Sequence, residues 1–63
     1  MGLKIKIARI KKGIKVKELA KKVGISYQYL SDIERGKYTN ISLKLLKNIA
    51  KELDLKVSDI IDD

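Results

Sequence analysis

The sequence predicts an all-α fold, a compact bundle of five short helices in a single domain over residues 1–63. Apolar residues recur every three or four positions through most of the chain, which is the period of a helix. Gly13, Gly24 and Gly36 fall where such segments end, and glycine commonly terminates helices. Phe, Trp, Pro and Cys are absent, so the core must be aliphatic and no disulfide can support this small domain.

The first predicted helix covers about residues 2–12. Four large aliphatic residues recur at spacings of four, three and four, namely Leu3, Ile7, Ile10 and Ile14. We expect this stripe to face the core. Lysines that lie off the stripe should be solvated, namely Lys4, Lys11 and Lys12. Gly13 then ends the helix.

Residues 16–35 predict two short helices joined by a tight turn. The first has an apolar face made of Val16, Leu19, Ala20 and Val23. Gly24 can adopt the positive φ that a sharp turn requires, and Ile25 would fill the corner. Ser26 is a candidate N-cap for the second helix, about residues 27–35, in which Leu30 and Ile33 face inward. This arrangement is a helix-turn-helix.

Two further helices are predicted after a short polar loop. Ser42 can cap a helix that runs to about Leu53. Its apolar face would consist of Leu43, Leu46, Ile49, Ala50 and Leu53, with Leu45 outside it. A short fifth helix follows from Val57 to Ile61. Two carboxylates at its C-terminal end oppose the helix dipole, so we expect fraying at Asp62 and Asp63.

The formal net charge is +7, and the whole excess lies in the first third of the chain. Residues 1–22 hold nine basic residues and one acidic residue, whereas residues 41–63 hold four basic and five acidic residues. A one-sided basic surface indicates a polyanionic partner. The alternative is a lysine-rich solvated surface without such a partner.

The ordered set of motifs resembles the lambdoid-repressor type of helix-turn-helix, also called the XRE family. The matching motifs are Leu19-Ala20, Gly24-Ile25-Ser26, Leu30-Ser31 and Ile33-Glu34-Arg35-Gly36. The resemblance implies a lambda repressor-like DNA-binding domain and a transcription regulator of the repressor type that acts as a homodimer on a pseudo-palindromic operator. Family members usually have Ser or Thr before the fifth helix, where this chain has Lys56.

An enzymatic function is not expected. The sequence has no His or Cys, no glycine-rich phosphate loop and no metal-ligand cluster, so neither a catalytic site nor a metal or cofactor is predicted. A domain this small should also lack a drug-sized pocket, and no small-molecule ligand is predicted.

No apolar run is long enough to span a bilayer or to serve as a signal peptide, so we expect a cytoplasmic protein. The alternative function is an antitoxin-like or other module that binds a protein partner.

The rotation of the second motif helix predicts which residues read DNA bases. Since Leu30 and Ile33 face the core, the opposite face carries Tyr27, Gln28, Ser31 and Asp32. Gln28 is the strongest candidate because its amide can bond adenine N6 and N7 together. Tyr29 should lean towards the following loop. The predicted phosphate contacts are Lys15, Lys17, Ser26, Lys37, Tyr38 and Asn40.

An ion pair within the domain and an interface between two copies of the chain are also predicted. The family resemblance implies an ion pair between Arg9 and Glu34, which would fix the angle of the recognition helix. The C-terminal segment carries more apolar surface than one short helix can bury, which predicts a homodimer interface. Its predicted members are Leu45, Leu55, Val57, Ile60 and Ile61. The alternative is that these residues complete the core of the monomer.

Overall fold

The computed structural model describes residues 1–61 and confirms the prediction of an all-α bundle. The five helices are α1 (Gly2–Lys12), α2 (Val16–Val23), α3 (Tyr27–Glu34), α4 (Leu43–Glu52) and α5 (Val57–Ile60). The fraying expected at Asp62 and Asp63 lies outside the described residues. No helix within residues 1–61 is long and apolar enough to cross a membrane.

The helix ends follow the local sequence. Gly13 and Gly24 terminate α1 and α2 with φ angles of 77° and 78°, a conformation that glycine adopts without a steric cost. The Ser26 hydroxyl accepts a hydrogen bond from the Tyr29 backbone N–H at 3.0 Å and caps α3, as predicted. Ser42 caps α4 in the same way, through the Leu45 backbone N–H at 3.1 Å.

The fifth helix begins without a hydroxyl cap. Lys56 occupies the N-cap position, and its backbone N–H donates to the Asp59 carboxylate at 2.9 Å. An acidic side chain in the first turn therefore satisfies an amide at the helix start. This contact is the half of a capping box that the side chain at the third helical position makes, and Lys56 has no side-chain acceptor for the other half.

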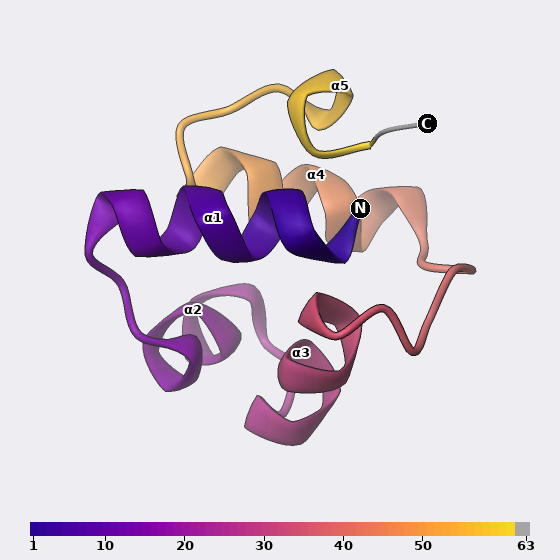
Figure 1. The fold of residues 1–63 in the computed structure, drawn as a ribbon, viewed down its shortest axis with the longest axis horizontal. Coiled ribbons are helices and arrows are strands. Elements are labelled where there is room, and N and C mark those ends of the chain that lie inside the picture. The colour runs from indigo at the N-terminus through magenta and orange to yellow at the C-terminus, as the bar shows by residue number, and fades with distance from the viewer. Residues whose placement is uncertain (62–63) are drawn as a thin grey trace.

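The helices enclose one aliphatic core. In the view of Figure 1, α1 crosses the middle of the molecule, with α2 and α3 below it and α5 above it, while α4 overlaps α1 and packs against α2 and α5. The fully buried large side chains come from all five helices, namely Ile5, Leu19, Leu30, Ile33, Ile49 and Ile60. The prediction that Leu30 and Ile33 face inward is therefore confirmed.

The prediction of which face of α1 is buried is wrong. Leu3, Ile7 and Ile10 are 65%, 44% and 57% exposed, and only Ile14, beyond the helix end, is buried. The buried residues of α1 are instead Gly2, Ile5 and Arg9, on the opposite side of the helix. The helix takes this rotation because its buried side has to accommodate the pairing of Arg9 and a close backbone approach at Gly2.

Two predictions about the C-terminal half also need correction. Leu43, expected in the core face of α4, is 56% exposed at the start of that helix. Ile60, expected in a dimer interface, is 0% exposed within the monomer. Its side chain completes the core where α5 packs on α1 and α4, so it has no surface left for a second subunit.

Candidate nucleic-acid interface

Helix α3 lies at the surface, with one face buried in the core and the other exposed. Leu30 and Ile33 anchor it in the core, and it packs against α2 and α1. Eight residues make a helix about 12 Å long, which is the rise of three to four base pairs, and a helix diameter of about 10–12 Å fits the major groove of B-DNA. The side chains on its outer face are therefore displayed at the scale of a few base pairs.

A buried ion pair fixes the C-terminal end of α3 to α1. The Arg9 guanidinium donates through Nε to Glu34 Oε2 at 2.8 Å and through Nη2 to Glu34 Oε1 at 3.0 Å. The two side chains are 10% and 5% exposed. Arg9 Nη1 also donates to the Ile14 carbonyl oxygen at 2.8 Å. The pair expected between these residues is thus present, and it is bidentate, which is the most directional form of such a contact.

A close backbone approach fixes the same end of α3 a second time. A Cβ atom on Gly2 would lie 2.3 Å from the Ile33 carbonyl oxygen and 2.8 Å from that of Glu34. Real Cβ atoms essentially never come this near to backbone oxygen. Only glycine lets the first turn of α1 lie against the last turn of α3, and sequence reasoning did not identify this role.

The predicted base-reading residues share the outer face of α3. Tyr27 is 48% exposed, Gln28 is also exposed, and Ser31 and Asp32 are half-buried. Tyr27 and Gln28 stand in the first turn of the helix, and the Lys17 ammonium lies 5.9 Å from the centroid of the Tyr27 ring. This contact is a cation–π interaction, which brings a predicted phosphate contact beside a predicted base contact.

Asp32 forms the centre of a polar network on this face. Its Oδ1 accepts hydrogen bonds from Gln28 Nε2 at 3.1 Å and from Arg35 Nη2 at 2.8 Å, and Lys37 Nζ lies 3.8 Å away. Sequence reasoning did not assign Arg35 to the site, although its position three residues after Asp32 places both on one helix face.

The same partners control the ionisation of Asp32. The hydrogen bond from Arg35 is the main cause that lowers the pKa of Asp32 from 3.8, assisted by Gln28 and Lys37 and opposed by burial. The carboxylate is therefore charged at neutral pH. Its stabilising contacts are present above the ordinary pKa and are lost as the pH falls through the lowered value of the folded state.

The predicted phosphate contacts lie at the start of each motif helix and in the loop after α3. Lys15, Lys17 and Ser26 are exposed, Lys15 at the N-cap position of α2 and Ser26 at that of α3. Beyond α3, Lys37, Tyr38 and Asn40 are exposed in the loop. The Tyr38 ring packs edge-on against Tyr29 with centroids 5.1 Å apart, so Tyr29 leans towards the loop as expected.

The remaining residues of the predicted dimer interface lie at the other end of the chain. Ile61 is 42% exposed, and Leu45, Leu55 and Val57 are half-buried against the core. These four side chains retain apolar surface, whereas Ile60 does not.

Comparison with known proteins places these features in context. The helix-turn-helix family model matches residues 5–60. The HTH-type transcriptional regulator SinR of Bacillus subtilis is 40% identical over 63 residues, which is 100% of this chain and 57% of SinR. This chain therefore spans about half of the length of the first curated relatives it matches.

Two solved structures share the fold closely. A crystal structure of SinR, the master regulator for biofilm formation, in complex with DNA has a TM-score of 0.90 and 39% identity, covering 97% of this chain and 100% of that one. A complex of SinR with SinI has a TM-score of 0.91 and 40% identity, covering 98% of this chain and 60% of that one. The relatives are named as regulators and not as enzymes, in agreement with the prediction of a non-enzymatic binding domain.

Proposed function

Because this chain belongs to the helix-turn-helix family, we propose that it is a sequence-specific DNA-binding transcription regulator of the repressor type. Helix α3 enters the major groove of double-stranded DNA with its N-terminal residues towards the base edges. The observation that carries this proposal is the outer face of α3, where Tyr27 and Gln28 stand exposed on a helix anchored at its other end by Glu34.

The network around Asp32 supports a reading role for Gln28. An amide has two N–H donors and one carbonyl acceptor, and only one donor is used by Asp32. Within residues 1–61 the second N–H and the carbonyl oxygen make no hydrogen bond, so they are available to meet adenine N7 and N6, respectively. Asp32 therefore acts as a brace that orients Gln28 before DNA arrives, which reduces the entropy lost on binding.

Selection of bound sequences from random duplex DNA tests the proposal. We expect enrichment of a pseudo-palindromic site whose half-sites are one duplex turn apart, about 34 Å. Fluorescence anisotropy on the selected site should then show saturable binding that weakens steeply with salt. Absence of saturable duplex binding at low salt would reject a DNA-binding function.

The flanking lysines are proposed to hold the phosphate backbone. Lys15→Ala should lower the slope of log affinity against log salt by about 1, and it should weaken all duplex sequences alike. Lys4→Ala, on α1 and outside the helix-turn-helix motif, is the matched control and should leave the slope unchanged. A change in base preference with an unchanged salt slope would show that Lys15 does not contact a phosphate.

We infer that the regulator is a homodimer through its C-terminal segment, with an isologous interface that places two α3 helices on one operator. Ile61→Ser removes exposed apolar surface worth about 0.7 kcal/mol per subunit, which is about 1.4 kcal/mol per dimer, and should weaken operator binding about tenfold. The control Leu43→Ser changes a more exposed side chain on α4, at 56% against 42% for Ile61. Light scattering that reports a monomer both free and on the operator would exclude the dimer.

Binding of a protein partner is the second candidate function. The exposed aliphatic face of α1 favours it, because the DNA-reading face on α3 makes no use of those side chains.

A further inference from the structure

Helix α1 has two apolar faces, and only one of them is covered. Gly2, Ile5 and Arg9 face the interior, whereas Leu3, Ile7 and Ile10 form an aliphatic stripe on the outside. Their spacing of four and three places them along about two turns of one helix face. We refer to these three residues as the outer stripe. These side chains keep 65%, 44% and 57% of their surface exposed, so apolar area remains here for a partner molecule to bury.

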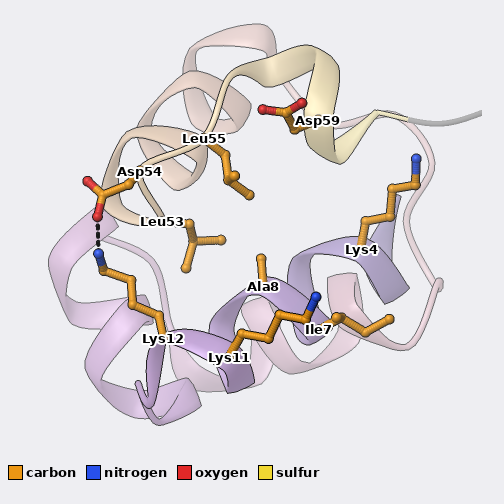
Figure 2. Close-up of a pocket in the computed structure, with 9 residues that line it drawn as sticks. All are labelled: Lys4, Ile7, Ala8, Lys11, Lys12, Leu53, Asp54, Leu55 and Asp59. Atoms are coloured by element: carbon orange, nitrogen blue, oxygen red, sulfur yellow. Dashed lines mark hydrogen bonds and ion pairs between the residues drawn. The ribbon is translucent and has the colours of Figure 1, made fainter.

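A groove adjoins the outer stripe on the side of α5. It has a volume of about 620 Å³ and lies between α1 and the connection from α4 to α5, which corrects the expectation that the domain lacks a cavity of this size (Figure 2). Ala8, Leu53 and Leu55 point into it, and Ile7 forms the edge that it shares with the outer stripe (Figure 2). The stripe and the groove together make a surface that is partly convex and partly hollow.

The charges around this surface are mainly basic. Lys4 and Lys11 lie on the groove side of the outer stripe, and Lys6 lies on its other side. All three are exposed, and none has an ion-pair partner among the described residues. The two acidic residues at the groove are already engaged, since Asp54 pairs with Lys12 and Asp59 caps α5 through the Lys56 backbone N–H.

We propose that the outer stripe and its groove bind an acidic amphipathic helix of a partner protein. Apolar side chains at positions i, i+3 or i+4, and i+7 of the partner would contact the stripe and enter the groove, the usual mode of helix-in-groove recognition. Its flanking carboxylates would meet Lys4, Lys6 and Lys11, which lack partners in the described structure.

Other occupants fit this surface less well. A second copy placed across a two-fold axis would bring the unpaired lysines of both chains together, and like charges at an interface are costly. A lipid surface is flat on the scale of one helix, so it would leave the hollow between Ala8 and Leu55 unfilled. DNA would satisfy the lysines but would not cover the aliphatic stripe.

Two synthetic 18-residue peptides test the proposal on the whole chain without DNA, so the outcome is independent of operator binding. Both carry leucines at helical spacing, one with flanking glutamates and the other with flanking lysines. By fluorescence anisotropy the glutamate peptide should bind saturably and at least about tenfold more tightly than the lysine peptide, the ratio that 1.4 kcal/mol produces. Amide shifts in NMR spectra should move along α1 and at residues 53–55.

Variants at exposed positions separate the two components of the surface. Ile7→Ser should weaken the glutamate peptide about tenfold, while Leu43→Ser, an exposed aliphatic control on α4, should leave it unchanged. The double variant Lys4→Glu/Lys11→Glu should prefer the lysine peptide. Equal affinity for both peptides, no saturable binding of either, or an unchanged preference in the double variant would overturn the proposal. So would sedimentation showing a dimer that Ile7→Ser dissociates, or binding only to phosphatidylglycerol vesicles.

Discussion

Replacing Arg9 by Met is expected to leave most molecules unfolded at 25 °C. The substitution leaves the Glu34 carboxylate buried without its partner and removes the hydrogen bond to the Ile14 carbonyl oxygen. Breaking a buried pair from one side costs about 3–5 kcal/mol. A core in a chain of this size rarely supplies more than about the same amount. Helical circular dichroism against urea concentration should therefore show little or no folded baseline.

The exposed pair of Lys12 and Asp54 provides a matched control, because it also joins α1 to a distant segment. Its side chains are 37% and 76% exposed, and Lys12→Met should cost no more than about 1 kcal/mol. Combining Arg9→Met with Glu34→Leu should recover part of the lost stability, since no charge is then left buried. Equal losses for Arg9→Met and Lys12→Met, or no coupling in the double variant, would show that the buried pair does not hold the fold together.

Replacing Gly2 by Ala should destabilise the domain by about 2–3 kcal/mol, although alanine is the better helix former. The added Cβ would collide with the carbonyl oxygens of Ile33 and Glu34, which belong to the backbone and cannot turn away. The first turn of α1 must then move off α3, a form of overpacking. Thermal unfolding followed by circular dichroism measures the loss.

Whether Gly2→Ala raises or lowers the stability shows whether the close contact between α1 and α3 exists. If the close approach did not exist, Gly2→Ala would stabilise α1 through its higher helix propensity, by up to about 1 kcal/mol. An unchanged or raised unfolding midpoint would therefore contradict the contact. Leu3→Ala, at a neighbouring position that is 65% exposed, controls for changes in the first turn and should be nearly neutral.

Helix positions and turn residues were predictable because their signals are local. Glycines at helix ends and Ser26 and Ser42 as caps act on their own neighbouring backbone, so the sequence around them is sufficient. The rotation of α1 was not predictable from its periodicity, because two stripes of helical spacing compete and the more apolar one faces outward. The ion pair that the family resemblance implied decides between them, since Arg9 lies on the side opposite Leu3, Ile7 and Ile10.

In the candidate site, too, local features were predictable and contacts between distant segments were not. The inward placement of Leu30 and Ile33 was sufficient to predict that Tyr27 and Gln28 are exposed on α3. The polar network around Asp32 involves Arg35 and the loop residue Lys37, whose approach depends on the path of the chain after α3. The role of Gly2 depends on how closely two helices approach, which a single sequence does not specify.

The base preference of Gln28→Ala tests most directly whether α3 reads DNA sequence. Binding of the wild-type chain and the variant is measured against the selected operator and every single-base variant of one half-site. We expect a loss of about 1–3 kcal/mol on the preferred site and a flattened preference at one base pair per half-site, with the other positions unchanged. A uniform loss of affinity, or a preference profile identical to that of the wild type, would show that Gln28 does not read a base from α3.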